Sequence, residues 1–259
     1  DTGIALGGIV GRCDKAPTIS GCKNYATIKQ NGFGGYDKTK RAHISGILGN
    51  CTVGGIQITE CENHGTVEYV SANPRKDART DVAGIVATTA SSGNLIKGCK
   101  NYGTINYKAK KTNAGEVTVA GITGCPQSTT IVENCENHGL VHASGATTSG
   151  YDIGGIAGGP SGAAVEFLNC KNYGEVKQSG AAGGSTYVGG IIGYGYSFHV
   201  MNGCENHGPV TILNTTTKSL YVGGLVGWAR IASGNGTAAV AHTIKNSGTI
   251  NVAGESKHN

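Results

Sequence analysis

Aromatic residues, methionine and proline are scarce in this chain of 259 residues, which has three Phe, one Trp, one Met and five Pro. A globular core of this size normally draws on large aromatic side chains. Ile, Val, Ala and Cys must therefore fill the interior, which suits a narrow tube. No run of 18 apolar residues is present, so the sequence predicts no membrane span. It also shows no signal-peptide pattern, and we interpret it as a mature or excised segment of a longer surface protein.

Acidic residues are too few and too scattered for the usual glycan-cleaving chemistry. That chemistry needs two or three carboxylates within about 5–10 Å, or carboxylates that hold calcium beside a basic residue. The six Asp form no D-x-D or D-D pair, and Asp37, Asp77 and Asp81 lie in connections crowded with Lys and Arg. No paired C-x-x-C motif of a zinc site is present. We predict no enzymatic activity, no catalytic residue, no cofactor and no metal site.

Glycine, by contrast, is abundant, with 45 residues, and a seven-residue motif recurs along the chain. The motif reads Cys-x-Asn-x-Gly-x-(Val/Ile), and its copies lie 34–40 residues apart. They begin at Cys22, Cys61, Cys99, Cys135, Cys170, Cys204 and, with the cysteine replaced, Ile244. A small apolar segment precedes each copy and a variable polar connection follows it. Such a period identifies a repeat architecture, so we treat residues 1–259 as a single repeat domain.

Short β-branched runs interrupted by Gly and Asn predict strands, because Gly and Asn at this density cost a helix too much. Apolar residues nowhere recur at helical spacing for three turns. We predict an all-β fold, a parallel β-solenoid of about seven coils built from 34–40-residue repeats. Each coil should contain three short strands that hydrogen-bond to the next coil at about 4.8 Å.

Two alternating positions in the motif indicate that the coils stack in register. The residue after the cysteine alternates between Lys and Glu, and the residue after the asparagine alternates between Tyr and His. Alternating charge is useful where neighbours lie directly opposite each other, although descent from a duplicated two-repeat unit would also produce it. In a stacked array the asparagines should form a structural ladder at a turn, with each amide bonding the next coil. The ladder would contain Asn24, Asn63, Asn101, Asn137, Asn172, Asn206 and Asn246.

The nine cysteines are an odd number, so at least one thiol has no partner within the chain. Three of them lie nine or ten residues before a cysteine of the motif, which allows disulfides within a coil. The candidate pairs are Cys13–Cys22, Cys51–Cys61 and Cys125–Cys135. The alternative is a buried ladder of free thiols.

The Gly-Gly-Ile-Val-Gly segment at residues 7–11 and the Asn-Cys-x-Asn-x-Gly-x-Val pattern at residues 169–176 resemble the GLUG repeat. This short motif occurs in bacterial surface and secreted proteins, beside IgA-cleaving metallopeptidase domains and in adhesin-like proteins. The resemblance covers nearly the whole chain and implies an extracellular or cell-surface β-solenoid that serves as a spacer or adhesive region. The metallopeptidase signature H-E-x-x-H is absent, so no protease activity is carried over.

Cations concentrate in the first three variable connections, whereas the next three are mostly Gly, Ser, Ala and Thr. In stacked coils they would form one basic edge, consisting of Lys38, Lys40, Arg41, Arg75, Lys76, Arg79, Lys108, Lys110 and Lys111. A patch of one sign attracts anionic glycans or envelope polymers. The alternative is a solvated set of loops that protects the sheet edges from aggregation.

These observations favour an extracellular structural or adhesive β-solenoid whose partner is a cell-surface or extracellular polymer or glycan, and we do not expect nucleic acid as a partner. The alternative is a subunit of a self-assembling fibre or surface layer. Seamless stacking of copies would, however, place Lys245 over Lys23, and like charges in that position repel. A glycan-cleaving β-helix enzyme ranks last.

Overall fold

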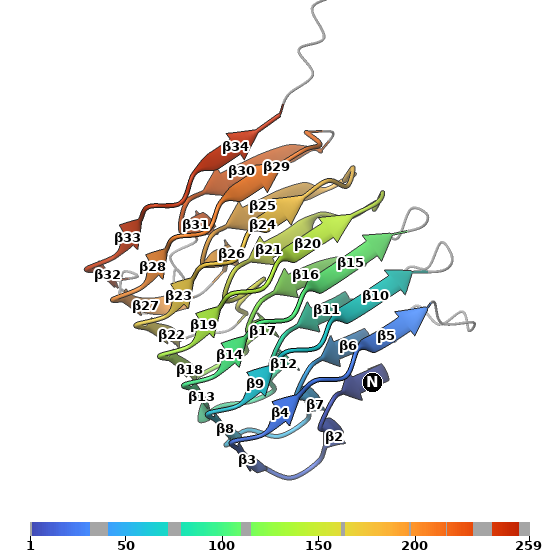
Figure 1. The fold of residues 1–259 in the computed structure, drawn as a ribbon, viewed down its shortest axis with the longest axis vertical. Helices are drawn as coiled ribbons and strands as arrows, with labels where there is room; N and C mark the ends of the chain where they lie inside the picture. Colours follow the sequence, from blue (N-terminus) through green and yellow to red (C-terminus); the bar gives the residue numbers. More distant parts are fainter. Residues whose placement is uncertain are drawn as a thin grey trace, which may run out of the picture.

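The computed structural model describes residues 2–31, 41–71, 79–109, 115–161, 164–196, 198–215, 217–229 and 240–253. The fold is an all-β solenoid in which every strand pair is parallel and the coils climb along one axis (Figure 1). The predicted fold class is therefore confirmed. In the part of the chain that is described, no helix is long and apolar enough to cross a membrane.

Each coil passes through five sheets, here named A to E in chain order. Sheet A contains β1 (Thr2–Gly7), β6 (Arg41–Ser45), β11 (Arg79–Ala83), β16 (Glu116–Ala120), β21 (Tyr151–Gly154), β25 (Ser185–Gly189) and β30 (Ser219–Gly223). Sheet B contains β2 (Val10–Cys13), β7 (Leu48–Cys51), β12 (Val86–Thr88) and β17 (Thr123–Cys125), then β26 (Ile192–Gly195) and β31 (Val226–Ala229). Between these two groups Ala157 continues the ladder through isolated bridges.

The remaining three sheets follow one another along the near face in Figure 1. Sheet C contains β3 (Thr18–Ser20), β8 (Gln57–Thr59), β13 (Asn94–Lys97), β18 (Thr130–Glu133), β22 (Val165–Leu168), β27 (Phe198–Asn202) and β32 (Val240–His242). Sheet D contains β4 (Lys23–Asn24), β9 (Glu62–Asn63), β14 (Lys100–Asn101), β19 (Glu136–Asn137), β23 (Lys171–Asn172), β28 (Glu205–Asn206) and β33 (Lys245–Asn246). Sheet E contains β5 (Ile28–Asn31), β10 (Val67–Ser71), β15 (Ile105–Ala109), β20 (Val141–Ser144), β24 (Val176–Gln178), β29 (Val210–Ile212) and β34 (Ile250–Val252).

The expectation of three strands per coil is wrong, because most coils have five. Two local features divide what would be one long strand into the short strands of sheets C, D and E. A residue in the left-handed region precedes the motif cysteine, as at Glu60 with φ of 52°. The motif asparagine then ends the sheet D strand, and the turn to Gly65 begins the next one. Each interruption redirects the chain, so a coil is built from short segments.

The core divides into two apolar compartments. One lies between sheets B and C and contains Leu48, Ile58 and the motif cysteines, of which Cys61 is fully buried. The other lies between sheets A and E and contains Ile44 and Val67. Both compartments run through successive coils, because the same repeat position fills the same place in each coil. The few aromatic residues are thus replaced by columns of aliphatic side chains.

The asparagine ladder separates the two compartments, and its prediction is confirmed. Each Nδ2 donates to the Oδ1 of the asparagine in the next coil, and all six links, from Asn24 through to Asn246, are 2.8 Å long. The same Nδ2 also donates to a backbone oxygen two residues on, as from Asn63 to Gly65. Each buried amide therefore has partners in its own coil and in the next, which satisfies the polar atoms inside an apolar interior.

Glycine is required opposite this ladder because the backbones approach closely. A Cβ on Gly46 would lie 2.3 Å from the Oδ1 of Asn63 and 2.4 Å from the carbonyl oxygen of Gly84. No side chain fits there, which explains why the small apolar segment keeps a glycine in every coil. The glycine segment and the asparagine motif are thus two halves of one contact.

Candidate functional site

The predicted basic edge is only partly described. Lys38, Lys40, Arg75, Lys76, Lys110 and Lys111 lie outside the described residues. Arg41 is exposed at the start of β6, and Lys108 is exposed in β15, so both sit where sheet E leads to sheet A. Arg79 is a correction, because it is 8% exposed and bonded within the fold. It does not contribute to an exposed patch.

The cysteines are free thiols rather than disulfides within a coil. The reason is that cysteines are neighbours along the solenoid axis. Cys13 of β2 pairs in the strand register with Cys51 of β7, one coil away. The Sγ of Cys61 donates to the carbonyl oxygens of Thr59 and Ile19. Burial raises the pKa of Cys125 to about 12, which keeps that thiol protonated. The alternative of a buried thiol ladder is the arrangement observed.

The alternating Tyr and His residues form an outer column of stacked rings. Tyr102 lies between His64 and His138, with centroid distances of 4.8 and 4.9 Å. Tyr173 likewise lies between His138 and His207. Both ring faces of these two tyrosines are therefore occupied, although the residues as a whole are 42% and 41% exposed. A sugar that stacks on a ring face has no place on either of them.

The alternating charges beside this column are paired between coils, as the sequence predicts. Lys23 bonds Glu62 at 3.1 Å, and the same contact recurs from Lys100 to Glu136 and from Lys171 to Glu205. Hydrogen bonds from His64 and Lys23 lower the pKa of the Glu62 carboxyl. These pairs are exposed to solvent and contribute little stability individually. They favour the correct register of neighbouring coils.

A second set of columns, which sequence reasoning missed, runs outside the apolar core where sheets A and B meet, and it is largely buried. We name it the A/B seam and define it by two columns of side chains. The sheet A column contains His43, Asp81, Thr118, Asp152, Tyr187 and Tyr221, paired in register from coil to coil. The sheet B column contains Thr88, Cys125, Tyr194 and Trp228. Strand alternation turns the sheet A column away from the core formed by Ile44 and its equivalents.

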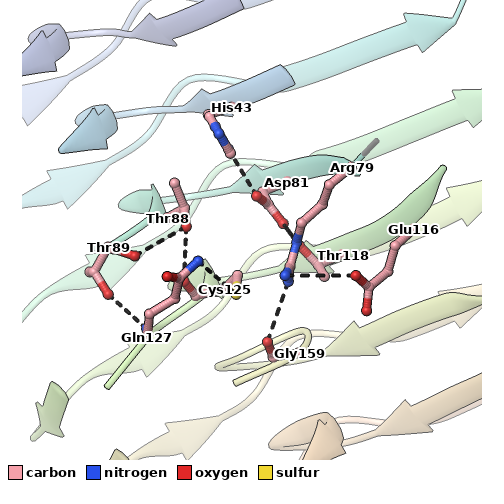
Figure 2. A network of polar contacts seen from close by, with 10 residues as sticks. All are labelled: His43, Arg79, Asp81, Thr88, Thr89, Glu116, Thr118, Cys125, Gln127 and Gly159. Carbon is pink, nitrogen blue, oxygen red and sulfur yellow. Dashed lines mark hydrogen bonds and ion pairs between the residues drawn. The ribbon is translucent and has the colours of Figure 1, made fainter. Parts of the chain in front are cut away.

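The seam begins as a buried charge network centred on Asp81, which is fully buried in β11 (Figure 2). Its carboxylate contacts Nδ1 of His43 at 2.8 Å and Nε of Arg79 at 2.7 Å, and accepts a hydrogen bond from Thr118. Burial would raise the pKa of this carboxyl, but Arg79 and His43 lower it to about 2. Asp81 is therefore ionised, and it lies inside a strand rather than in a connection as the sequence suggested.

Arg79 extends the network across two coils. Its Nη1 lies 3.7 Å from Oε2 of Glu116, and its Nη2 donates to the carbonyl oxygen of Gly159. Figure 2 shows the guanidinium reaching from Asp81 toward both groups. The charge of Arg79 is thus compensated by two carboxylates. The sequence analysis assigned Arg79 to an anion-binding edge. Its guanidinium instead compensates the carboxylates of Asp81 and Glu116 inside the seam.

Over the next two coils the seam holds two neighbouring carboxyl groups, Glu116 of β16 and Asp152 of β21. Asp152 is 4% exposed and lines the same pocket as Glu116, whose side chain is 50% exposed. Burial and the neighbouring Glu116 charge raise the pKa of Asp152 well above its usual range. Both effects favour the neutral form of the Asp152 carboxyl.

Beyond the carboxyl pair the seam becomes aromatic. Tyr187 stacks on Tyr221 with centroids 5.1 Å apart, and Tyr194 stacks on Trp228 at 4.8 Å. The two columns touch each other, since Tyr187 and Tyr194 are 4.6 Å apart. Tyr221 is 40% exposed. The C-terminal end of the seam is therefore a continuous, partly exposed aromatic surface.

A pocket of about 430 Å³ lies where the polar and aromatic parts of the seam meet. Its walls include Glu116, Asp152, Tyr187 and Tyr194, and the loop segments at 148–150 and 184–185 complete it. Volumes of this size are typical of small-molecule sites. Within the described ranges no group of three or more His, Cys, Asp or Glu side chains is arranged to hold a metal ion.

Comparison with known proteins adds one likeness. No family model and no curated protein matches the sequence. A crystal structure of a candidate immunoglobulin A1 protease from Bacteroides ovatus is similar over 93% of this chain and 80% of that chain. The two share 16% identity, with a TM-score of 0.43. A likeness of this degree carries no inference about the activity of this chain.

The protonated Asp152 predicts an unusual pH dependence of stability. Since its folded pKa is raised, the native state binds the extra proton above pH about 4, and stability falls as pH rises through that interval. Asp152→Asn mimics the protonated acid and should gain stability relative to wild type by up to about 1.4 kcal/mol per pH unit. Urea unfolding at pH 4 and pH 7 measures this difference.

The control is Asp14→Asn, which changes an exposed carboxyl whose pKa is lowered by Arg12. This variant should not gain stability over wild type with rising pH. Parallel stability curves for Asp152→Asn and wild type between pH 4 and pH 7 would show that Asp152 is ionised throughout.

Proposed function

We propose that this chain is an extracellular structural and adhesive β-solenoid, a stiff stalk or adhesin segment that presents binding surfaces along its length. The observation that carries the proposal is that residues at nearly every position of the motif make contacts between successive coils. The asparagine, cysteine and aromatic columns each run through successive coils. Such a stack holds its surface positions at fixed spacing. The resemblance to the GLUG repeat of surface and secreted proteins supports the same proposal.

A basic edge would supply one of these surfaces. Arg41 and Lys108 are both exposed at the side of the solenoid where sheet E leads to sheet A. The sequence places six further cations in the same connections, at residues 38–40, 75–76 and 110–111. The corresponding connections of the later coils are nearly uncharged. A field of one sign attracts sulfated or uronic glycans and other anionic polymers.

Charge reversal tests this edge. The double variant Arg41→Glu/Lys108→Glu should bind a heparin column at least ten-fold more weakly, since each cation near an anionic surface contributes about 1 kcal/mol. The matched control is Lys177→Glu/Lys218→Glu, which makes the same charge change in the later coils and should reduce binding far less. Equal losses in the two variants would show that only net charge matters, and unchanged retention would refute the edge as a binding surface.

The alternative, a subunit of a seamless self-assembling fibre, meets two obstacles in the stacking geometry. A second copy placed in register on the last coil would bring Lys23 over Lys245. It would also bring Ala26 over Gly248, at a corner where a Cβ on Gly248 itself would lie 2.0 Å from the oxygen of Gly208. Both contacts are unfavourable, so stacking without an adapting segment is not the arrangement we propose.

A further inference from the structure

We infer that Cys13 and Cys51 form a site of oxidative modification, at which a small-molecule disulfide converts the two thiols to a cross-link between the first coil and the second. This cross-link differs from the disulfides within a coil that the spacing of the cysteines allows. It would form whether or not the basic edge binds polyanions. Three features support it: the strand register, the direction of the thiols and the exposure of Cys13.

The strand register places the two cysteines side by side. Cys13 ends β2, Cys51 ends β7, and the two residues are partners in this parallel strand pair. Neighbouring strands lie about 4.8 Å apart, and disulfides join Cα atoms that are about 4.4–6.8 Å apart. Both side chains pack against the apolar compartment between sheets B and C, so they share one face of the sheet. A cross-link therefore requires rotation of two side chains and little movement of the backbone.

The thiols point across the gap between the coils. The Sγ of Cys13 donates to the carbonyl oxygen of Asn50 in the second coil at 3.7 Å, and the Sγ of Cys51 donates to that of Lys15 in the first coil at 3.9 Å. Each sulfur thus lies toward the strand that holds the other one. Both hydrogen bonds are long, whereas the thiol of Cys61 donates over 3.3 and 3.5 Å. Little is lost when Cys13 and Cys51 give up their protons.

Other cysteines near this pair lack its arrangement. Cys125, the third cysteine of sheet B, is fully buried, and its register partner in the preceding coil is Thr88. Cys22 is partly buried like Cys13, but its thiol donates to the carbonyl oxygen of Ser20 in its own coil at 3.5 Å. Within sheet B, Cys13 and Cys51 are thus the place where two thiols adjoin and one of them is reached from solvent.

The exposure of the two residues sets the order of the reaction. Cys13 is partly exposed between the exposed residues Arg12 and Asp14, whereas Cys51 is fully buried. The Cys13 thiolate therefore attacks oxidised glutathione first, which forms a mixed disulfide and releases one glutathione. The Cys51 thiolate then attacks the Sγ of Cys13 and displaces the second glutathione. Two protein thiols are oxidised to one disulfide, and one glutathione disulfide is reduced to two thiols.

The rate of this exchange should rise with pH. Burial and the neighbouring Cys51 thiol raise the pKa of Cys13 to about 12. The reactive thiolate is therefore scarce at neutral pH, and mildly alkaline solution increases its fraction.

The cross-link would secure the first coil, because residues 13 and 51 are one coil apart and the bond closes a whole turn of the solenoid. The described side chains of β1 and β2 are only partly buried or exposed, whereas β7 is buried throughout. Segments with little buried surface open at the lowest cost in free energy. A disulfide removes many of the open conformations, so it should suppress that opening.

Peptide mapping of the full chain tests the site. The chain is incubated with oxidised glutathione in mildly alkaline solution, the remaining thiols are blocked with N-ethylmaleimide, and the product is cleaved after Lys, Arg and Glu. Such cleavage separates the four relevant cysteines into fragments 13–15, 16–23, 42–60 and 61–62. Mass spectrometry should find fragment 13–15 joined to fragment 42–60. Hydrogen exchange of the amides in β1 and β2 should become at least about ten-fold slower than in the reduced chain.

Two serine variants of the first coil provide the matched comparison. Cys13→Ser should lose both the cross-link and the slower exchange, whereas Cys22→Ser replaces another partly buried cysteine and should keep both. Cys13 joined to Cys22, to glutathione alone or to a second chain would overturn the site, as would thiols that stay unchanged. Loss of the cross-link in both variants would show that strand register does not bring the two thiols together.

Discussion

Replacing Asp81 with Asn is expected to lower the free energy of unfolding by about 3 kcal/mol, the largest effect we predict for a side chain outside the apolar core. The substitution keeps the shape of the side chain and removes only its charge. Arg79 then remains buried, with Glu116 as its nearest carboxylate at 3.7 Å. The loss arises mainly from this uncompensated guanidinium rather than from missing contacts. Denaturation by urea at pH 7 measures it.

The pH dependence of wild-type stability is a second test of the same network. The pKa of Asp81 is lowered to about 2, so its stabilisation is present above the unfolded pKa near 4 and is lost as pH falls toward 2. Asp81→Asn should lack this acid-sensitive component. Asp14→Asn changes an exposed ion pair and should alter stability by less than about 0.5 kcal/mol. Equal effects of the two substitutions would mean that the network is solvated.

The periodic parts of the structure could be predicted from sequence because the same residue makes the same contact in each coil. The asparagine ladder and the paired Lys and Glu residues all repeat at one position of the motif. Repetition makes such a column visible without coordinates. The number of strands was wrong because a left-handed residue such as Glu60 gives no clear sequence signal. Glycine, Asn, Glu and Thr all occupy that position in different coils.

The A/B seam was missed for the opposite reason, since its residues differ from coil to coil. His43, Asp81, Thr118, Asp152 and Tyr187 occupy one column, yet they share no chemistry that a repeat comparison would reveal. A weak signal did exist: each of them stands three residues before the glycine that directly precedes the Ile of the small apolar segment. Aligning the coils on that glycine shows the change from polar to aromatic residues. Variation at a fixed position of a rigid repeat is thus where function is best sought.

Replacing Gly139 with Ala is expected to destabilise the solenoid by about 3 kcal/mol or more, because the corner of the motif has no room for a methyl group. A Cβ on Gly139 would lie 1.9 Å from the carbonyl oxygen of Gly103 and 2.9 Å from Nδ2 of Asn101. Relief of that overlap requires neighbouring coils to separate, which lengthens the hydrogen bonds of the asparagine ladder. Thermal and urea unfolding should both show the loss.

The chain contains its own control for this substitution, because the first described coil has Ala26 where the later motif copies have glycine. The Gly65 corner lies directly over Ala26, whereas no described coil lies on the other side of Ala26. Its methyl group is therefore tolerated, and Ala26→Gly should change stability by no more than about 1 kcal/mol, mainly through backbone entropy. If Gly139→Ala were as mild as Ala26→Gly, the close approach of successive coils at this corner would be wrong. A large loss in the former alone would show that stacking, and not turn geometry, demands the glycine.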